Sequence, residues 1–239
     1  MKKVKVLILK TAGTNNDIET AQGFELAGAS CEIVHINRFL RKEKKISDYK
    51  ILAIPGGFSY SDDISAGKIF ANKLKYKLNS EIMKFAKSKK LIIGICNGFQ
   101  VLLEAGLLPG AMVRNDCQRF VCKYVNLRTE STDTPFTRRI NKDAVLRIPV
   151  AHGEGCYYAD EQTLRELKEK DQVVFRYVSP EGVVTPEANP NGSVENIAGI
   201  CNAERNVLGM MPHPERCSED LLTSVDGRSI FESLLAGSV

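Results

Sequence analysis

The chain has 239 residues, 43% of them hydrophobic and 26% charged, which is ordinary for a globular protein long enough to bury a full core. The net charge of +4 is small, and the one basic run, residues 41–45, has no interleaved aromatic residues, so we interpret it as a solvated loop and expect no nucleic-acid partner. No apolar run approaches the roughly 20 residues of a membrane span, and seven cysteines without a CxxC pair indicate reduced thiols; we therefore expect a cytoplasmic protein with no membrane contact.

The first 95 residues alternate between apolar runs and segments with helical spacing. Four runs predict buried strands: Val4–Leu9, Cys31–Ile36, Lys50–Ile54 and Leu91–Ile95. Helices are predicted between them over residues 16–28, 65–74 and 80–89, and Asn16 followed by Glu19 resembles a capping box at the start of the first helix. Because near-continuous apolar strands alternate with helices, we expect an α/β fold with an open, mostly parallel sheet and helices on both faces.

A different pattern begins after residue 110. Residues 119–127 and 145–150 are extended and partly alternating, which predicts a small antiparallel addition at the edge of the sheet. The remaining predicted elements are helices at 160–170 and 228–235, a strand at 172–178, a loop rich in Pro, Gly and Asn at 179–193, and a hairpin that pairs 197–201 with 207–211. No clear linker divides the chain, so we expect one domain over residues 1–239.

A glycine-flanked cysteine follows the predicted strand at residues 91–95. Cys96 lies between Gly94 and Gly98, and an apolar stripe at helical spacing comes after it. The pattern G-x-nucleophile-x-G is typical of a sharp strand-to-helix turn, and the two glycines let neighbouring backbone approach closely. The positive end of the helix favours the thiolate, which is the reactive form. The alternative is a structural cysteine buried at the end of a core strand, which would not need both glycines.

A cysteine nucleophile needs a base, and the chain has three histidines. His35 lies inside a predicted strand and is interpreted as structural. His213 follows a predicted strand, is bracketed by two prolines that restrict its backbone, and precedes Glu215, which is placed to orient the imidazole. Sites in open α/β sheets form beyond the carboxyl ends of the strands. We therefore expect Cys96, His213 and Glu215 to converge as nucleophile, base and orienting group, and the alternative for the last two is a surface turn.

Residues 55–57 read Pro-Gly-Gly and follow the third predicted strand. As a plain turn they need no function. Beside a cysteine elbow, we expect them to contribute to an oxyanion hole. The backbone N–H groups of Gly57 and Asn97 would then hold the charge of a tetrahedral intermediate, each worth roughly 3–4 kcal/mol of barrier.

Two His-x-Glu pairs, which begin at His152 and His213, raise the alternative of a metal site. The sequence lacks the P-C-x-x-C element that completes the site of zinc deaminases, and ligation would leave the cysteine elbow without a role. A phosphate loop is excluded because the Gly-Lys pair at residues 67–68 is not followed by Ser or Thr. We therefore expect no metal here, and any ATP that the reaction uses would bind elsewhere.

Residues 94–100 together with residues 212–215 resemble the signature of class I, triad-type glutamine amidotransferases. The segments Pro55–Tyr60, Asn189–Ser193 and Gly209–Arg216 narrow the resemblance to the glutaminase subunits of phosphoribosylformylglycinamidine synthase, an enzyme of purine biosynthesis. The resemblance covers nearly the whole chain and implies the flavodoxin-like sheet architecture of that family.

The resemblance implies that such a protein releases ammonia from L-glutamine. Cys96 would attack the side-chain amide to form a γ-glutamyl thioester, and His213, oriented by Glu215, would protonate the departing ammonia. His213 would then activate the water that releases glutamate. Weaker candidates for gripping the glutamine are Gln100, Asn115, Arg119 and Phe120.

The resemblance also implies partners. Ammonia would pass to a large synthetase subunit that uses ATP and Mg, and a small third subunit would complete the assembly, so this chain itself would bind no cofactor. We expect slow turnover by the isolated chain and a movable loop at residues 56–63 that couples it to the partner. In that loop Ser61 stands where the family leads us to expect glycine, and a positive φ there would strain the serine. Three alternatives stay open: a glutaminase that serves another synthetase, a different thiol hydrolase on the same fold, and a non-catalytic interaction subunit.

Overall fold

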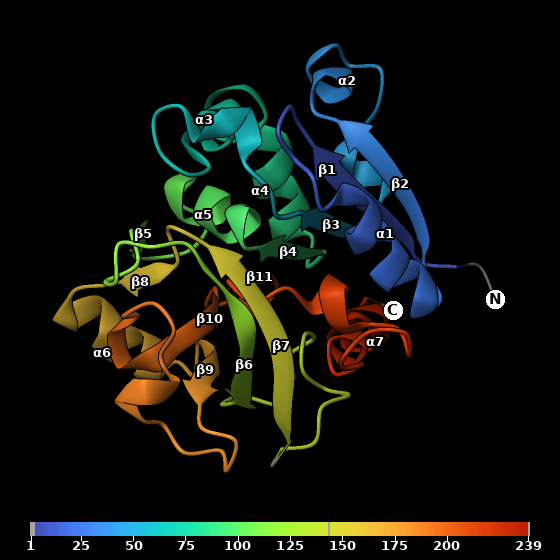
Figure 1. Ribbon diagram of the computed structural model, residues 1–239. Helices are drawn as coiled ribbons and strands as arrows, with labels where there is room; N and C mark the ends of the chain where they lie inside the picture. Colours follow the sequence, from blue (N-terminus) through green and yellow to red (C-terminus); the bar gives the residue numbers. More distant parts are fainter. Residues whose placement is uncertain (1–2, 143, 239) are drawn as a thin grey trace.

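The computed structural model describes residues 3–142 and 144–238 and is built on a nine-stranded sheet (Figure 1). The strands lie in the order β2-β1-β3-β4-β11-β10-β9-β6-β7. The first five are parallel to one another: β2 Ser30–His35, β1 Lys5–Lys10, β3 Ile51–Ile54, β4 Leu91–Ile95 and β11 Val207–Met210. The other four pair antiparallel: β10 Ile197–Cys201, β9 Val173–Val178, β6 Val121–Thr129 and β7 Val145–His152. A separate ladder joins β5 Ala111–Val113 to β8 Cys156–Tyr158.

Helices cover the parallel half of the sheet on both faces (Figure 1). The helices of one face are α1 Asp17–Leu26 and α7 Arg228–Gly237, and those of the other are α3 Lys68–Lys77, α4 Asn79–Lys87 and α5 Asn97–Glu104. The short α2 Asn37–Leu40 follows β2, and α6 Glu161–Glu169 lies beside the antiparallel half. No helix among the described residues is long and apolar enough to cross a lipid bilayer.

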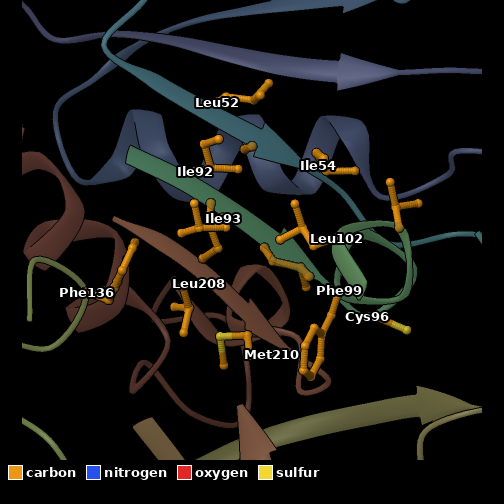
Figure 2. Close-up of a cluster of buried hydrophobic side chains, with 14 of the residues drawn as sticks. Leu52, Ile54, Ile92, Ile93, Cys96, Phe99, Leu102, Phe136, Leu208 and Met210 are labelled. Carbon is orange, nitrogen blue, oxygen red and sulfur yellow. The ribbon is translucent and has the colours of Figure 1, made fainter. Parts of the chain in front are cut away.

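The core lies between the parallel strands and their helices because these strands are apolar on both faces. Every residue of β3 and β4 is buried, as a strand between two helical layers requires. Figure 2 shows side chains of β3, β4, β11 and α5 packed together, with Phe99 of α5 over β11. A Cβ on Gly209 of β11 would overlap the Phe99 ring, so glycine at this position sets how closely α5 approaches the sheet.

The predicted α/β fold, with its parallel sheet, two helical layers and antiparallel addition, is confirmed. The strand at 91–95 is placed as predicted, and the other boundaries shift by at most three residues. The predicted hairpin of β10 and β11 is also confirmed. It joins β9, β6 and β7 to the parallel strands, so the antiparallel part of the sheet is larger than the small edge addition that we expected. The separate ladder of β5 and β8 was not predicted, since three-residue strands leave no periodic pattern.

One local prediction is wrong. Asn16 precedes α1, but its side chain makes no capping hydrogen bond, and its backbone N–H donates to the Gly56 carbonyl at 3.4 Å rather than to Glu19. The side-chain amide instead donates to Glu215, 199 residues away in the chain. A tertiary contact overrides the local pattern here because a buried carboxylate without partners costs more free energy than an unmade helix cap.

Candidate active site

Cys96 lies at the turn where β4 ends and α5 begins, with its sulfur directed away from the apolar cluster (Figure 2). Its backbone has φ 50° and ψ −106°, which is strained for a residue with a side chain. The flanking glycines allow this turn. A Cβ on Gly98 would overlap the carbonyl of Ile54, and a Cβ on Gly94 would press against the carbonyl of Gly98. The sharp elbow predicted from the G-x-C-x-G pattern is therefore present.

Cys96 forms part of the wall of a cavity of about 340 Å³, a size that suits a small ligand. The cysteine is 5% exposed, and its Sγ lies 3.7 Å from the carbonyl oxygen of Ala151 in β7. The cavity is thus closed on one side by the antiparallel strands and on the other by the carboxyl ends of the parallel ones. Cys96 is also the residue directly before the first turn of α5.

His213 follows β11 by three residues, and its side chain is 2% exposed. Its backbone N–H donates to the Pro149 carbonyl of β7 at 2.8 Å, which draws β7 over the site. The ring nitrogen Nδ1 lies 2.6 Å from Oε1 of Glu215, a residue of the 3-10 turn η5 Pro214–Cys217. The same carboxylate oxygen accepts from Asn16 Nδ2 at 3.2 Å. The Glu215 carboxylate therefore fixes the orientation of the His213 imidazole, and Asn16 fixes the position of the carboxylate.

The cysteine and the histidine lie side by side across Gly56. A Cβ on this glycine would be 2.9 Å from His213 Cε1 and 3.5 Å from Cys96 Cβ. Burial lowers the pKa of His213, but Glu215 and then Cys96 more than offset this and raise that pKa to about 10. Nε2 of His213 has no hydrogen-bond partner among the described residues. The ring is thus charged near neutral pH, with one nitrogen left for another group.

The two expected oxyanion donors come from the loop after β3 and from the first residue of α5. The backbone N–H of Gly57 and that of Asn97, the first residue of α5, make no hydrogen bond with any described residue. Gly57 has φ +135°, and a Cβ there would lie 2.7 Å from the Asn15 nitrogen. Glycine is therefore required at residue 57 for backbone reasons, and the N–H group that it presents is unused.

Of the four weaker candidates for glutamine binding, Gln100 and Phe120 lie in the cavity wall. Gln100 donates to the backbone carbonyl of Glu154 at 2.6 Å, which joins α5 to the loop after β7. Asn115 is fully buried behind the wall, where its side chain bonds to neighbouring backbone groups. Arg119 lines a shallower hollow beside the cavity. The structure thus brings two of the four to the site, and their contacts with glutamine stay predictions.

A second buried histidine, His152, lies in the same wall with different neighbours. Its Nδ1 is 3.1 Å from Asn115 Oδ1, and its Nε2 is 3.4 Å from Asn191 Nδ2. Burial, and then the charge of His213, lowers the pKa of His152 to about 4, so the ring is neutral. Over residues 3–142 and 144–238, no three His, Cys, Asp or Glu side chains gather as a metal ion would require. His152 therefore serves as a brace of the wall.

The loop after β3 reaches the site in a strained conformation. Tyr60, Ser61 and Asp62 have φ of 56°, 58° and 50°, so Ser61 does have the positive φ that strains a serine. The side chain of Asn97 ties this loop down: its oxygen accepts from the Ser59 N–H at 3.3 Å and its nitrogen donates to Asp62 at 3.3 Å. The residue after Cys96 is therefore in direct contact with the loop.

Asn16, Asp62 and Glu154 are among the residues of this cavity that sequence patterns did not identify as part of a site. Asn16 has the signature of a helix cap and Asp62 that of a polar loop residue. Glu154 was considered only as half of a His-x-Glu pair. Asn16 and Glu154 bond to segments far away in the chain, and Asp62 bonds to Asn97, 35 residues away, so no local spacing marks their place in the cavity.

Comparisons with known proteins agree with this geometry. Residues 3–232 match the model of the CobB/CobQ-like glutamine amidotransferase domain. The chain is 49% identical over 232 residues to phosphoribosylformylglycinamidine synthase subunit PurQ of Methanosarcina acetivorans, covering 97% of each chain. The PurQ subunit of Moorella thermoacetica is 48% identical over 235 residues, with 98% of this chain and 95% of the relative covered.

A solved structure agrees as well. One chain of the structure of PurLQS from Thermotoga maritima superposes with a TM-score of 0.83 at 38% identity, and the match covers 98% of this chain and 99% of that one. The fold, the strand-to-helix turn at Cys96 and the similar proteins therefore all indicate the same family. The chain belongs to the CobB/CobQ-like glutamine amidotransferase family, among the PurQ glutaminase subunits of phosphoribosylformylglycinamidine synthase in purine biosynthesis.

Proposed function

We propose that Cys96, His213 and Glu215 carry out the hydrolysis of L-glutamine in this chain. The observation that carries the proposal is the placement of a strained cysteine beside a buried imidazole that is paired with a carboxylate at 2.6 Å. The pKa of His213 is raised to about 10, so its ring holds the proton that the reaction needs. Nucleophile, base and orienting group are then all present, and the cavity gives a substrate access to them.

In the first step the Cys96 sulfur attacks the side-chain amide carbon of glutamine. The carbonyl oxygen becomes an oxyanion, and the free N–H groups of Gly57 and Asn97 are the donors available to it. His213 then gives its Nε2 proton to the amide nitrogen as the C–N bond breaks. Ammonia leaves, and a γ-glutamyl thioester remains on the sulfur.

In the second step a water molecule replaces ammonia. His213, now neutral, removes a proton from the water, whose oxygen attacks the thioester carbon. The C–S bond breaks, glutamate leaves, and the proton stays on the imidazole beside a restored thiolate. Glu215 holds Nδ1 throughout, so Nε2 keeps facing the reacting atoms.

The proposal extends to the assembly in which the ammonia is used. Because the Thermotoga maritima relative is part of PurLQS, we expect this chain to join a large synthetase subunit and a small third subunit. The synthetase would consume the ammonia with ATP and Mg to make formylglycinamidine ribonucleotide, so this chain would need no cofactor of its own. The cytoplasm is the expected compartment, in keeping with seven cysteines that form no disulfide.

The test is the release of glutamate by Cys96→Ala, with Cys117→Ala as a matched control because Cys117 is exposed and outside the cavity. We expect Cys96→Ala to lose activity while its thermal unfolding is unchanged, and the control to keep both. A chloroketone analogue of glutamine should label the wild-type chain once and Cys96→Ala not at all. Glutamate release at the wild-type rate by Cys96→Ala would refute the proposed nucleophile.

Coupling to the synthetase is a separate expectation. Gly56 lies against His213 and Asp62 accepts a hydrogen bond from Asn97, so residues 56–63 contact both the histidine and the residue after Cys96. A partner that stabilises one conformation of this strained loop would raise the rate of glutamine hydrolysis. Glutaminase rates should therefore increase when the synthetase is added, and equal rates with and without it would argue against coupling through the loop.

A further inference from the structure

A second cavity lies between the loop after α2 and helix α4. It measures about 550 Å³, and among the described residues it shares no lining side chain with the cavity at Cys96. The basic run at residues 41–45, interpreted above as a solvated loop, forms one side of it. We call it the lysine pocket after five cations in its wall: Lys42, Lys44, Lys45, Lys84 and Lys90.

The floor of the lysine pocket is apolar. Four buried side chains line it, from α2, from the 3-10 turn η1 Ile46–Asp48 and from either end of α4: Phe39, Ile46, Leu78 and Phe85. A cavity of this size, with mostly apolar walls and a few charged groups, is typical of a site for a small molecule. The pocket therefore has room for the apolar part of a compact ligand.

The charges around this floor are nearly all positive. Lys44 is paired with Glu32, but the other four lysines form no ion pair within the described residues. Glu81 is the one acidic side chain that the described part of the chain places in the wall. A ligand with a single carboxylate would leave most of these cations uncompensated. A phosphate group carries more charge and three strong acceptor oxygens, so it matches them better.

One of the unpaired cations, Lys90, is held against the apolar floor. Its Nζ lies 5.0 Å from the centroid of the Phe85 ring and donates to the Ser47 carbonyl at 2.6 Å. Burial, and then the charge of Lys50, lowers the pKa of Lys90, and Asp48 offsets this only in part. An ammonium group has three donors. The fold thus keeps a cation beside apolar surface without a negative partner, which an anionic ligand would supply.

We propose that the lysine pocket binds a nucleoside phosphate, with the phosphates at the lysines and the planar base against the apolar floor. Such a ligand joins a flat, largely apolar part to a multiply charged part, as this pocket requires, and lysine binds phosphate as a point charge. An acidic peptide would also match the lysines. Its backbone polar groups would lie unpaired on the apolar floor, however, and the cavity volume favours a compact ligand.

The lysine pocket and the cavity at Cys96 lie at opposite ends of β3. Ile46 and Ser47, which line the pocket, come before the first residue of this strand, whereas Gly56 and Gly57 follow its last residue. A nucleotide in the pocket is therefore no reactant in the hydrolysis proposed above. It is a separate ligand, and its binding does not depend on the roles of Cys96 and His213.

The experiment measures equilibrium binding to the full chain by calorimetry at low salt and without Mg. The probes are ATP, adenosine and inorganic triphosphate. We expect ATP to bind roughly tenfold or more tightly than either of the others, because only ATP engages both the floor and the lysines. Lys45→Gln and Lys84→Gln, made singly, should each weaken ATP binding about fivefold and leave adenosine unaffected. Lys87→Gln is the matched control because Lys87 is exposed on the same helix and lies outside the pocket.

Several outcomes would overturn the proposal. They are no measurable binding of ATP, triphosphate that binds as tightly as ATP, and a Lys87→Gln variant that loses as much affinity as the other two. A poly-glutamate peptide that binds more tightly than ATP and displaces it would assign the pocket to an acidic protein segment instead. Failure of the proposed hydrolysis would show itself separately, as glutamate release that survives Cys96→Ala, and would leave these affinities unchanged.

Discussion

The same three-residue pattern occurs twice in this chain, and the structure gives it two different uses. His213-Pro214-Glu215 follows β11, and His152-Gly153-Glu154 begins at the last residue of β7, both at the carboxyl edge of the sheet. In the first, Pro214 starts a 3-10 turn that brings the Glu215 carboxylate to 2.6 Å from the imidazole. In the second, the Glu154 carboxylate turns away to the Ala66 N–H and the imidazole meets amide side chains instead.

The difference appears in the charge of the two rings. A carboxylate and a cysteine raise the pKa of His213 despite its burial, whereas His152, with neutral amides around it, has its pKa lowered by burial. Identical spacing thus yields one charged imidazole and one neutral imidazole in the same cavity wall. The turn that each pattern adopts in the fold, and the neighbours that this turn brings to the ring, decide what a histidine does.

The largest expected effect separates the two histidines directly. His213→Asn should reduce the rate of glutamate formation by on the order of 10³-fold or more, since it removes the group that moves the protons. His152→Asn should act on stability, because it disturbs a buried hydrogen-bond network at a cost of about 1–3 kcal/mol. Steady-state rates and urea unfolding of both variants make the comparison. If His152→Asn, while still folded, loses as much activity as His213→Asn, the assignment of the two roles is wrong.

The second effect is a stability change with pH that has opposite sign for the two rings. The pKa of His152 is about 4 in the folded chain, below its ordinary value of 6.5, so folding resists its protonation and stability falls as pH drops from 6.5 towards 4. The loss attributable to it is about 3 kcal/mol. His213, with its pKa raised to about 10, contributes stability that is complete below pH 6.5 and is lost as pH rises through 10.

Urea unfolding at pH values from 4 to 10 tests both signs. His152→Asn should flatten the acid side of the curve, and His213→Asn should flatten the alkaline side. An acid limb that stays equally steep in His152→Asn would show that other groups dominate it.

The third effect concerns the residue that holds Glu215. Asn16→Ala removes the donor to Glu215 Oε1 and leaves the pair with His213 in place, so we expect roughly a tenfold loss of rate. Glu19→Ala is the control: as half of a capping box it would destabilise α1, whereas the structure gives it no such role. Rates and melting temperatures of the two variants decide between these interpretations. If Glu19→Ala destabilises the protein and Asn16→Ala loses no activity, the capping-box interpretation of Asn16 and Glu19 would be correct after all.

The smallest effect is expected in the loop after β3, which contacts both His-x-Glu patterns. Gly56 lies against His213, and Asp62 accepts from the Gly67 N–H beside the Ala66 N–H that donates to Glu154. Ser61→Gly relieves a φ of 58°. The strain relieved is about 1 kcal/mol and the added freedom of the unfolded chain takes back roughly half of it, so the net gain is about 0.5 kcal/mol. Lys89→Gly is the control, since Lys89 has the same φ far from the cavity. Both variants should be slightly more stable, and only Ser61→Gly should change the rate increase that the synthetase produces. A matching change in Lys89→Gly would remove the loop from the coupling.

Much of the fold was accessible from the sequence. Buried parallel strands are continuous apolar runs, and β4 was placed residue for residue because Leu91–Ile95 is bounded by a lysine pair and the elbow. The elbow was accessible for the same reason: a strained turn between close backbones needs Gly94 and Gly98 within a few positions of Cys96. These requirements are local, so they appear in the sequence as particular residues at a fixed spacing.

The rest of the cavity was not accessible because its contacts are not local. The bond from Asn16 to Glu215 joins residues 199 positions apart, and Asp62 and Glu154 meet only because Gly67 and Ala66 anchor them at one spot. Ala151 lies against the Cys96 sulfur only because the antiparallel strands turn β7 back over the parallel ones. No periodicity predicts such encounters.

By itself the sequence determined the α/β sheet, the strained cysteine and the candidates for its base, because each follows from the order of residues within about a dozen positions. The sequence favoured His213 as the base, but only the tertiary structure decided that its imidazole is charged while that of His152 is neutral. The reason is electrostatic. The pKa of a buried group depends on the charges within a few ångströms of it, and folding alone determines which charges those are.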